Sequence, residues 1–152
     1  MPVIKIKDAP LEAIAPQGHN AELGPYSARL LSDAGGLTQF GAFLETLPPG
    51  SFSSHKHWHE QEDEFVYVLS GRVMLNEGET LTEMLPGDAA TFKASVAVGH
   101  RLENRSDQPA TYLVVGTRSP DDMVHYTDKD LLLTKVGFEK RLTTKAGVKV
   151  ER

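Results

Sequence analysis

Three of the six histidines in this chain stand within five residues, in the segment HKHWHEQEDE that begins at His55. Four acidic residues follow them directly: Glu60, Glu62, Asp63 and Glu64. The chain has no cysteine, so a bound metal would have to take its ligands from imidazole and carboxylate groups. The segment therefore indicates chemistry at a divalent metal ion.

The spacing of these residues suits a strand. On a strand His55, His57 and His59 would project from one side, and two imidazoles one residue apart come close to one point. A carboxylate beside them completes the two-histidine, one-carboxylate set that divalent metals favour. Glu64 opens the apolar run FVYVL, where a carboxylate is costly unless it is paired or metal-bound. A further histidine, His100, lies in VGHRLEN next to another predicted strand.

Composition excludes several classes of protein. A length of 152 residues favours one domain, residues 1–152. The net charge of −5 gives no general attraction to nucleic acid or to an anionic membrane. The apolar runs are too short to span a bilayer, and MPVIKIKDAP lacks the apolar core of a signal peptide. We expect a cytoplasmic protein.

The pattern along the chain predicts an all-β sandwich or barrel, because short runs of branched and aromatic residues alternate with turn residues. The predicted strands are Val3–Lys7, Ser27–Leu31, Thr38–Leu47, Phe52–His59, Glu64–Ser70, Arg72–Leu75, Thr80–Met84, Ala89–Lys93, Arg101–Asn104 and Ala110–Thr117. In the tail we expect a short helix begun by Ser119-Pro120 and a hairpin or extended arm in LTTKAGVKV.

Other side chains are expected to play structural parts. Four of them should face away from the histidines and pack against the second sheet or a neighbouring subunit: Trp58, Phe65, Tyr67 and Leu69. Three charged residues read as solvated loop positions: Arg118, Asp121 and Asp122. For recognition of a phosphate group the sequence nominates only Lys93 and Arg101.

Two motifs carry a resemblance to a known family. Gly50, His57, His59, Glu64 and Gly71 give G-x6-H-x-H-x4-E-x6-G, which resembles the first cupin motif with one extra residue after the leading glycine. Fifteen residues, Arg72–Pro86, separate it from the second motif.

That second stretch contains Gly87, His100 and Asn104 and is similar to the second cupin motif. It departs from the family near FKAS, where Lys93 and Ser95 replace the usual proline and glycine and about two residues are inserted. We expect the fold to tolerate this departure. It should change only the shape of the loop at the opening of the barrel's internal cavity.

The resemblance implies a double-stranded β-helix, or jelly-roll barrel, with a short C-terminal extension. It implies one divalent metal ion per chain, zinc, manganese, iron or nickel, held by His57, His59, Glu64 and His100. His55 and His57 form an alternative pair. Only His59 stands at the short distance along the sequence from Glu64 that the family motif has, so we expect His57 and His59 to be the ligands. His55 is then expected at the rim of the site.

The chain as a whole resembles small bacterial cupins that carry the label sugar-phosphate isomerase. The resemblance implies a metal-dependent enzyme, or binder, of a small polar, oxygen-bearing metabolite, and no catalytic acid or base is identified. Two alternatives stay open: an iron-dependent dioxygenase and a non-catalytic small-molecule sensor. We also expect a homodimer, since a small barrel has exposed sheet edges and an outward aromatic face.

Overall fold

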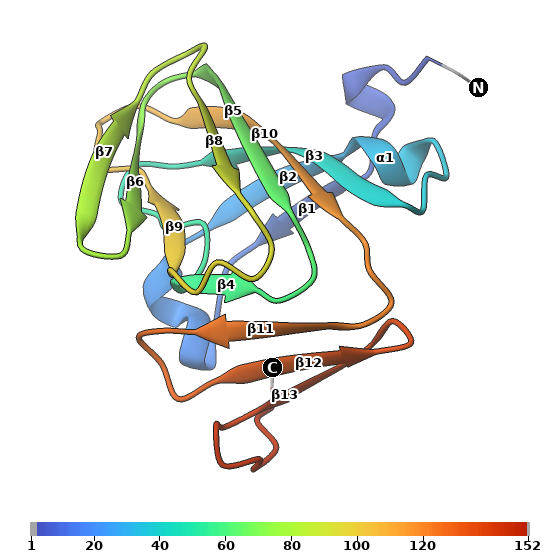
Figure 1. Ribbon diagram of the computed structural model, residues 1–152. Coiled ribbons are helices and arrows are strands. Elements are labelled where there is room, and N and C mark those ends of the chain that lie inside the picture. Colours follow the sequence, from blue (N-terminus) through green and yellow to red (C-terminus); the bar gives the residue numbers. More distant parts are fainter. Residues whose placement is uncertain (1–2, 152) are drawn as a thin grey trace.

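The computed structural model describes residues 3–151, and within them thirteen strands form two sheets (Figure 1). The first sheet has the order β1-β2-β3-β10-β5-β8. Its strands are β1 (Leu11–Ile14), β2 (Tyr26–Leu30), β3 (Phe40–Leu47), β10 (Ala110–Thr117), β5 (Glu64–Ser70) and β8 (Ala89–Phe92). The second sheet has the order β13-β12-β11-β4-β9-β6-β7. Its strands are β13 (Glu139–Thr143), β12 (Leu132–Val136), β11 (Asp122–Tyr126), β4 (His57–His59), β9 (His100–Glu103), β6 (Val73–Glu77) and β7 (Thr80–Met84).

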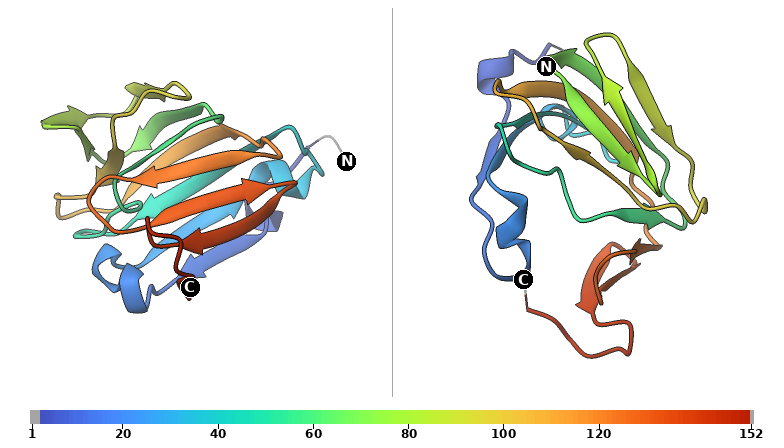
Figure 2. Two further views of the ribbon diagram at one scale, coloured as in Figure 1. Left: turned by 60° about the horizontal axis from the view of Figure 1, so that its bottom comes forward. Right: turned by 90° about the vertical axis from the view of Figure 1, so that its left-hand side faces the viewer.

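The core lies between the two sheets, which face each other in the right-hand view of Figure 2. Both sheets supply buried apolar side chains to it: Leu47, Val66, Val68, Val73, Met84, Ala90, Leu102, Ala110 and Tyr112. The helical segments are short: η1 (Ile6–Asp8), η2 (Gly18–Leu23) and α1 (Leu31–Ala34). Within residues 3–151 no helix is long and apolar enough to cross a membrane. The predicted all-β jelly roll is confirmed.

Eight of the ten predicted strands are present with bounds within two residues, and two are not as expected. Val3–Lys7 is not a strand: Val3 and Ile6 are 61% and 49% exposed, and the segment turns into η1. The edge position beside β2 belongs instead to Leu11–Ile14. The predicted strand Phe52–His59 is reduced to β4, with a single bridge from Phe52 to Glu103.

The tail differs most from the sequence-based expectation. There is no helix at Ser119-Pro120, and β11, β12 and β13 form an antiparallel meander. The meander extends the second sheet because β11 pairs with β4, with Val124 opposite His59 (Figure 1). A hairpin does close the tail, where Thr144 N–H donates to the Val148 carbonyl at 2.7 Å. The C-terminal extension is therefore part of the sheet that carries the histidines.

Gly71, the last glycine of the first motif, is required by its surroundings. Its φ is +74°, and a Cβ atom there would lie 2.5 Å from the Pro109 carbonyl oxygen. Any other residue would be strained in this backbone conformation and would also clash with the chain that leads into β10. The motif glycine thus sets the tight turn between β5 and β6.

Glu45 is a buried acid in the core, 7% exposed, and Tyr112 is 1% exposed beside it. The two residues are direct cross-strand partners on β3 and β10, and the Tyr112 hydroxyl donates a hydrogen bond to Glu45 Oε1. Burial raises the pKa of Glu45 to about 7, against the lowering effect of that hydrogen bond. The folded chain therefore binds a proton here that the unfolded chain has lost at neutral pH.

We expect the Glu45–Tyr112 pair to make the free energy of unfolding depend on pH. Between the ordinary pKa of 4.5 and about 7 the folded state holds more protons than the unfolded state, so stability falls as pH rises through that window. Glu45→Gln keeps an acceptor for Tyr112 and cannot ionise. Relative to wild type, the variant should gain up to about 3 kcal/mol of unfolding free energy at pH 8 and gain nothing near pH 4.5. Urea unfolding at several pH values measures this; equal pH dependence in both proteins would contradict it.

Candidate metal centre

His57 and His59 on β4 are each fixed by a hydrogen bond at Nδ1. His57 Nδ1 lies 2.8 Å from the carbonyl oxygen of His55, and His59 Nδ1 lies 2.6 Å from Asp122 Oδ2. A carbonyl and an ionised carboxylate only accept, so each Nδ1 carries the proton. In the neutral rings, Nε2 then presents a lone pair.

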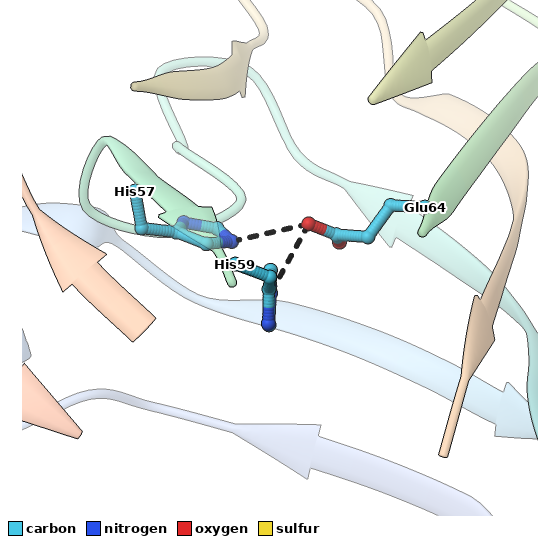
Figure 3. A group of neighbouring side chains, drawn as sticks. All are labelled: His57, His59 and Glu64. Carbon is cyan, nitrogen blue, oxygen red and sulfur yellow. Dashed lines mark ion pairs between the residues drawn. The ribbon is translucent and has the colours of Figure 1, made fainter. Parts of the chain in front are cut away.

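Both Nε2 atoms face one carboxylate oxygen. Glu64 Oε1 lies 3.5 Å from His57 Nε2 and 3.2 Å from His59 Nε2 (Figure 3). The donor atoms of these three residues all lie within 4.8 Å of one another. His100 is the cross-strand partner of His57, and its Nε2 lies 3.0 Å from the same Glu64 oxygen. The structure thus brings all four residues nominated from the motifs together around Glu64 Oε1.

The donor set fits a divalent cation. At these distances the two imidazole nitrogens and the carboxylate oxygen need positive charge between them, which a proton or a divalent ion can supply. Burial alone would raise the pKa of Glu64, but its hydrogen bonds with His100, His57 and His59 hold that pKa well below the ordinary range. Glu64 therefore stays an ionised oxygen donor, as metal ligation requires.

His59 and His100 differ in their electrostatic surroundings. Burial alone would lower the pKa of His59, but Glu64 and Asp122 raise it to about 9. For His100, burial lowers the pKa in spite of the contact with Glu64, and its ring stacks on Phe92 with centroids 3.7 Å apart. Without a metal, His59 is the position where a proton supplies the missing positive charge.

His55 does not share the side of His57 and His59, and it does not lie at a rim. Its ring is 4% exposed, and Nε2 lies 2.9 Å from the His19 carbonyl and 3.1 Å from Asn20 Oδ1. The segment before β4 bends rather than running as a strand, so the alternation of sides fails there. His55 ties the η2 turn to the sheet.

Asp122 was expected on a loop and is instead 4% exposed at the start of β11. Besides contacting His59, it accepts a hydrogen bond from the Gln61 backbone at 2.9 Å. A carboxylate that holds the Nδ1 proton of a ligating histidine fixes the orientation of the ring and makes it a better donor. No local sequence pattern indicated this role, since 63 residues separate Asp122 from His59.

Glu62 belongs with Asp122 and His59 to a second group of close donor atoms. Its carboxylate pairs with the Lys135 ammonium, and both side chains are almost buried, 12% and 11% exposed. It also accepts from the Ser119 backbone at 2.8 Å. Because a proton and an ammonium group already balance this second group, it orients His59 and does not offer a second vacant set of ligands.

Several cavities adjoin the four residues, and two of them reach Glu64 from the core and from the meander. An inner cavity of about 140 Å³ is lined by His57, Glu64 and His100 and reaches Glu45 and Tyr112 in the core. An end cavity of about 360 Å³ lies toward the meander. Its lining includes His59, Glu62, Glu64, Arg118, Lys135, Phe138 and Lys140. Glu64 borders both, so a small molecule could reach the centre from either.

The loop after β8, where the second motif departs from the family, borders a third cavity of about 260 Å³. Ser95 stands there with φ +68°, and its N–H donates to the His59 carbonyl at 2.8 Å. Serine thus adopts a backbone conformation that glycine usually takes, and the turn survives the substitution.

The residues nominated for phosphate recognition, Lys93 and Arg101, line different cavities. Arg101 Nε already donates to Glu103 at 2.7 Å, and its guanidinium lies over the Phe52 ring. Three basic side chains do converge beside the centre: Arg118, Lys135 and Lys140. Arg118 was predicted to be a solvated loop residue, and Lys135 and Lys140 lie in the tail, where the sequence analysis nominated no site residue.

A family model described as a cupin domain matches residues 43–116 of the chain. No curated protein matches the chain. A solved structure from Silicibacter pomeroyi, named a sugar phosphate isomerase from a cupin superfamily, is 37% identical with a TM-score of 0.91. The alignment covers 99% of this chain and 97% of that one.

Two further structures are similar. A protein from Acidithiobacillus ferrooxidans, named as a candidate sugar phosphate isomerase, is 30% identical with a TM-score of 0.78 and covers 87% of this chain and 83% of its own. A polyketide cyclase from Streptomyces resistomycificus is 22% identical with a TM-score of 0.62, covering 77% and 79%, and at that identity it shows the fold alone.

Proposed function

The chain belongs to the cupin superfamily, and from this premise we propose that it is a metal-dependent enzyme that acts on a small polar, oxygen-bearing metabolite. Within that class we propose a sugar isomerase-type reaction on a hydroxy-carbonyl compound. The observation that carries the proposal is the convergence of the His57 and His59 lone pairs on Glu64 at the border of two cavities.

The ligands of the proposed metal ion are His57, His59, Glu64 and His100, one ion per chain. A bound divalent ion would polarise a carbonyl or hydroxyl oxygen of the metabolite. The chain's own residues would orient the ligands through the His55 carbonyl and Asp122, and Phe43 and Val114 would keep bulk water from the cavities. Cupins run many reactions, so the isomerase assignment rests on the two relatives of that name.

We expect metal content to depend on these residues in a graded way. His57→Ala, His59→Ala and His100→Ala should each weaken metal binding by more than about 100-fold, because each removes a proposed ligand, whereas Asp122→Asn should cost about 10- to 100-fold. His55→Ala should retain the metal. Elemental analysis and competition with a chelator measure these values.

His55, His57 and His59 lie in one short segment, so their alanine variants can be compared directly to test which of them bind the metal. If His55→Ala empties the site while His59→Ala does not, the ligand assignment is wrong. Circular dichroism of each variant separates metal loss from unfolding, since the core between the sheets contains none of the four ligands.

The proposed reaction is tested by incubating the metal-loaded protein with aldoses, ketoses and their phosphates in D₂O. Isomerisation would transfer a proton between C1 and C2, so proton NMR should show the aldose and ketose interconvert, with deuterium at C1 or C2 when the proton exchanges with solvent. His100→Ala should abolish the reaction together with the metal.

Two other outcomes would each replace the proposal. Turnover that needs oxygen and iron would identify a dioxygenase. Tight binding of a metabolite without turnover under any metal would identify a sensor or carrier.

We further propose that the protein is a homodimer through the outer face of the first sheet. Phe65, Tyr67 and Leu69 on β5 project there and are 37%, 37% and 47% exposed, and Phe40 on β3 is 39% exposed. The second sheet does not cover these side chains, so the alternative of intramolecular packing for them is wrong. Trp58 is different, since it stacks on His125 within the second sheet.

A contiguous apolar face of this kind is typical of a protein interface. Light scattering at micromolar concentration should give twice the chain mass, and Tyr67→Glu should shift the protein to the monomer because it buries an unpaired charge. A monomeric wild-type protein would remove this proposal and leave the metal centre unaffected.

A further inference from the structure

The end cavity exists because side chains are missing from one row of the first sheet. Gly41 on β3 lies opposite Gly116 on β10, and Gly116 lies opposite Glu64 on β5. The two glycines leave space beside the Glu64 carboxylate. Arg118 enters part of it, since a Cβ atom on Gly41 would lie 3.1 Å from Arg118 Nε. The guanidinium is thus placed at the wall of the cavity.

The opposite wall is the β12–β13 hairpin, which holds two lysines in direct cross-strand register. Lys135 on β12 pairs with Lys140 on β13, and both line the end cavity. Like charges directly opposite each other on one face of a sheet are destabilising. Negative charge close by would relieve this repulsion.

One of the two lysines has an acidic partner and the other does not. Lys135 pairs with Glu62 in an almost buried contact. Among residues 3–151, Lys140 has no ion pair. Arg118 pairs with Asp33 of α1 and donates to the Leu37 carbonyl at 3.3 Å. Lys140 is thus the uncompensated cation of the cavity.

The charges of the whole lining lead to the same conclusion. The lining holds three basic residues, Arg118, Lys135 and Lys140, and only two acidic ones, Glu62 and Glu64. This excess occurs in a chain whose net charge is −5. A volume of about 360 Å³ is that of a small-molecule site. An anion in this cavity would lie beside Glu64 and its histidines.

We propose that the end cavity binds an oxyanion, a phosphate ester or a carboxylate, through Lys140 and Arg118. Lys135, fixed by Glu62, adds to the attraction without being the main contact. In the proposed reaction this oxyanion is the anionic group of the substrate, whose other end extends to Glu64. That last assignment rests on the proposed function, whereas the anion site itself does not.

The test uses the full chain and three probes: inorganic phosphate, acetate and neutral glycerol. Isothermal titration should show that wild type binds phosphate or acetate and not glycerol. Lys140→Met should weaken anion binding by about 10-fold or more, as expected for loss of a charge-assisted contact. Phosphate without acetate would identify a phosphate ester as the ligand, and the reverse would identify a carboxylate.

Arg141→Met is the matched control, because Arg141 neighbours Lys140 on the exposed strand β13 and projects from the opposite side. It removes the same charge and should change anion affinity less than about 2-fold, as a surface charge outside the site. Equal losses in Lys140→Met and Arg141→Met, or no anion binding by wild type at millimolar probe, would overturn the proposal.

Each titration is repeated after chelator treatment, with metal content measured on the same samples. Phosphate binding that depends on Lys140 in both preparations supports the anion site, even if the metal or the isomerase reaction proves wrong. Binding that disappears with the metal in every variant would assign the anion to the metal centre and overturn the proposal. If a sugar phosphate proves to be a substrate, Lys140→Met should raise the KM for the sugar phosphate. The KM for the corresponding neutral sugar should not rise.

Discussion

The arrangement of the site depends on three donor groups that are held at one point and need positive charge between them. His57 and His59 direct their Nε2 lone pairs at Glu64 because their Nδ1 protons are donated elsewhere, to the His55 carbonyl and to Asp122. A flexible site would relax by turning the rings away. Here β4 is short and is paired on both sides, with β11 and β9, so the ligands stay in place. A rigid set of donors, in which a divalent cation can take the place of the proton on His59, favours metal binding.

The C-terminal meander bears directly on this constraint. It supplies Asp122 to His59 and Lys135 to Glu62, and it forms one wall of the end cavity with Lys140. The matched family region ends at residue 116, before the meander begins. The barrel thus supplies the proposed metal ligands, while a later segment orients one of them and contributes to the charge of the cavity beside it.

Two buried acids illustrate how differently the fold treats carboxylates. Glu64 meets three histidines and remains ionised, whereas Glu45 meets only the Tyr112 hydroxyl and takes up protons far more readily. Both border the inner cavity, one at the centre and one at its far end in the core. The cavity therefore runs from a charged end to an end that is neutral or charged according to pH.

Local sequence determined most of the barrel and the proposed ligands. Alternating apolar runs with turn residues between them predicted β5, β7 and β10 to the residue, and the spacing of His57, His59 and Glu64 indicated the centre. These features are readable because strand alternation and motif spacing are short-range properties of the chain. Tertiary structure alone decided the rest. The bend that buries His55, the pairing of β11 with β4 that brings Asp122 to His59, and the approach of β12 that pairs Lys135 with Glu62 depend on segments far apart in the sequence. A pairing of that kind leaves no pattern in either segment, since each contributes only one side of the contact.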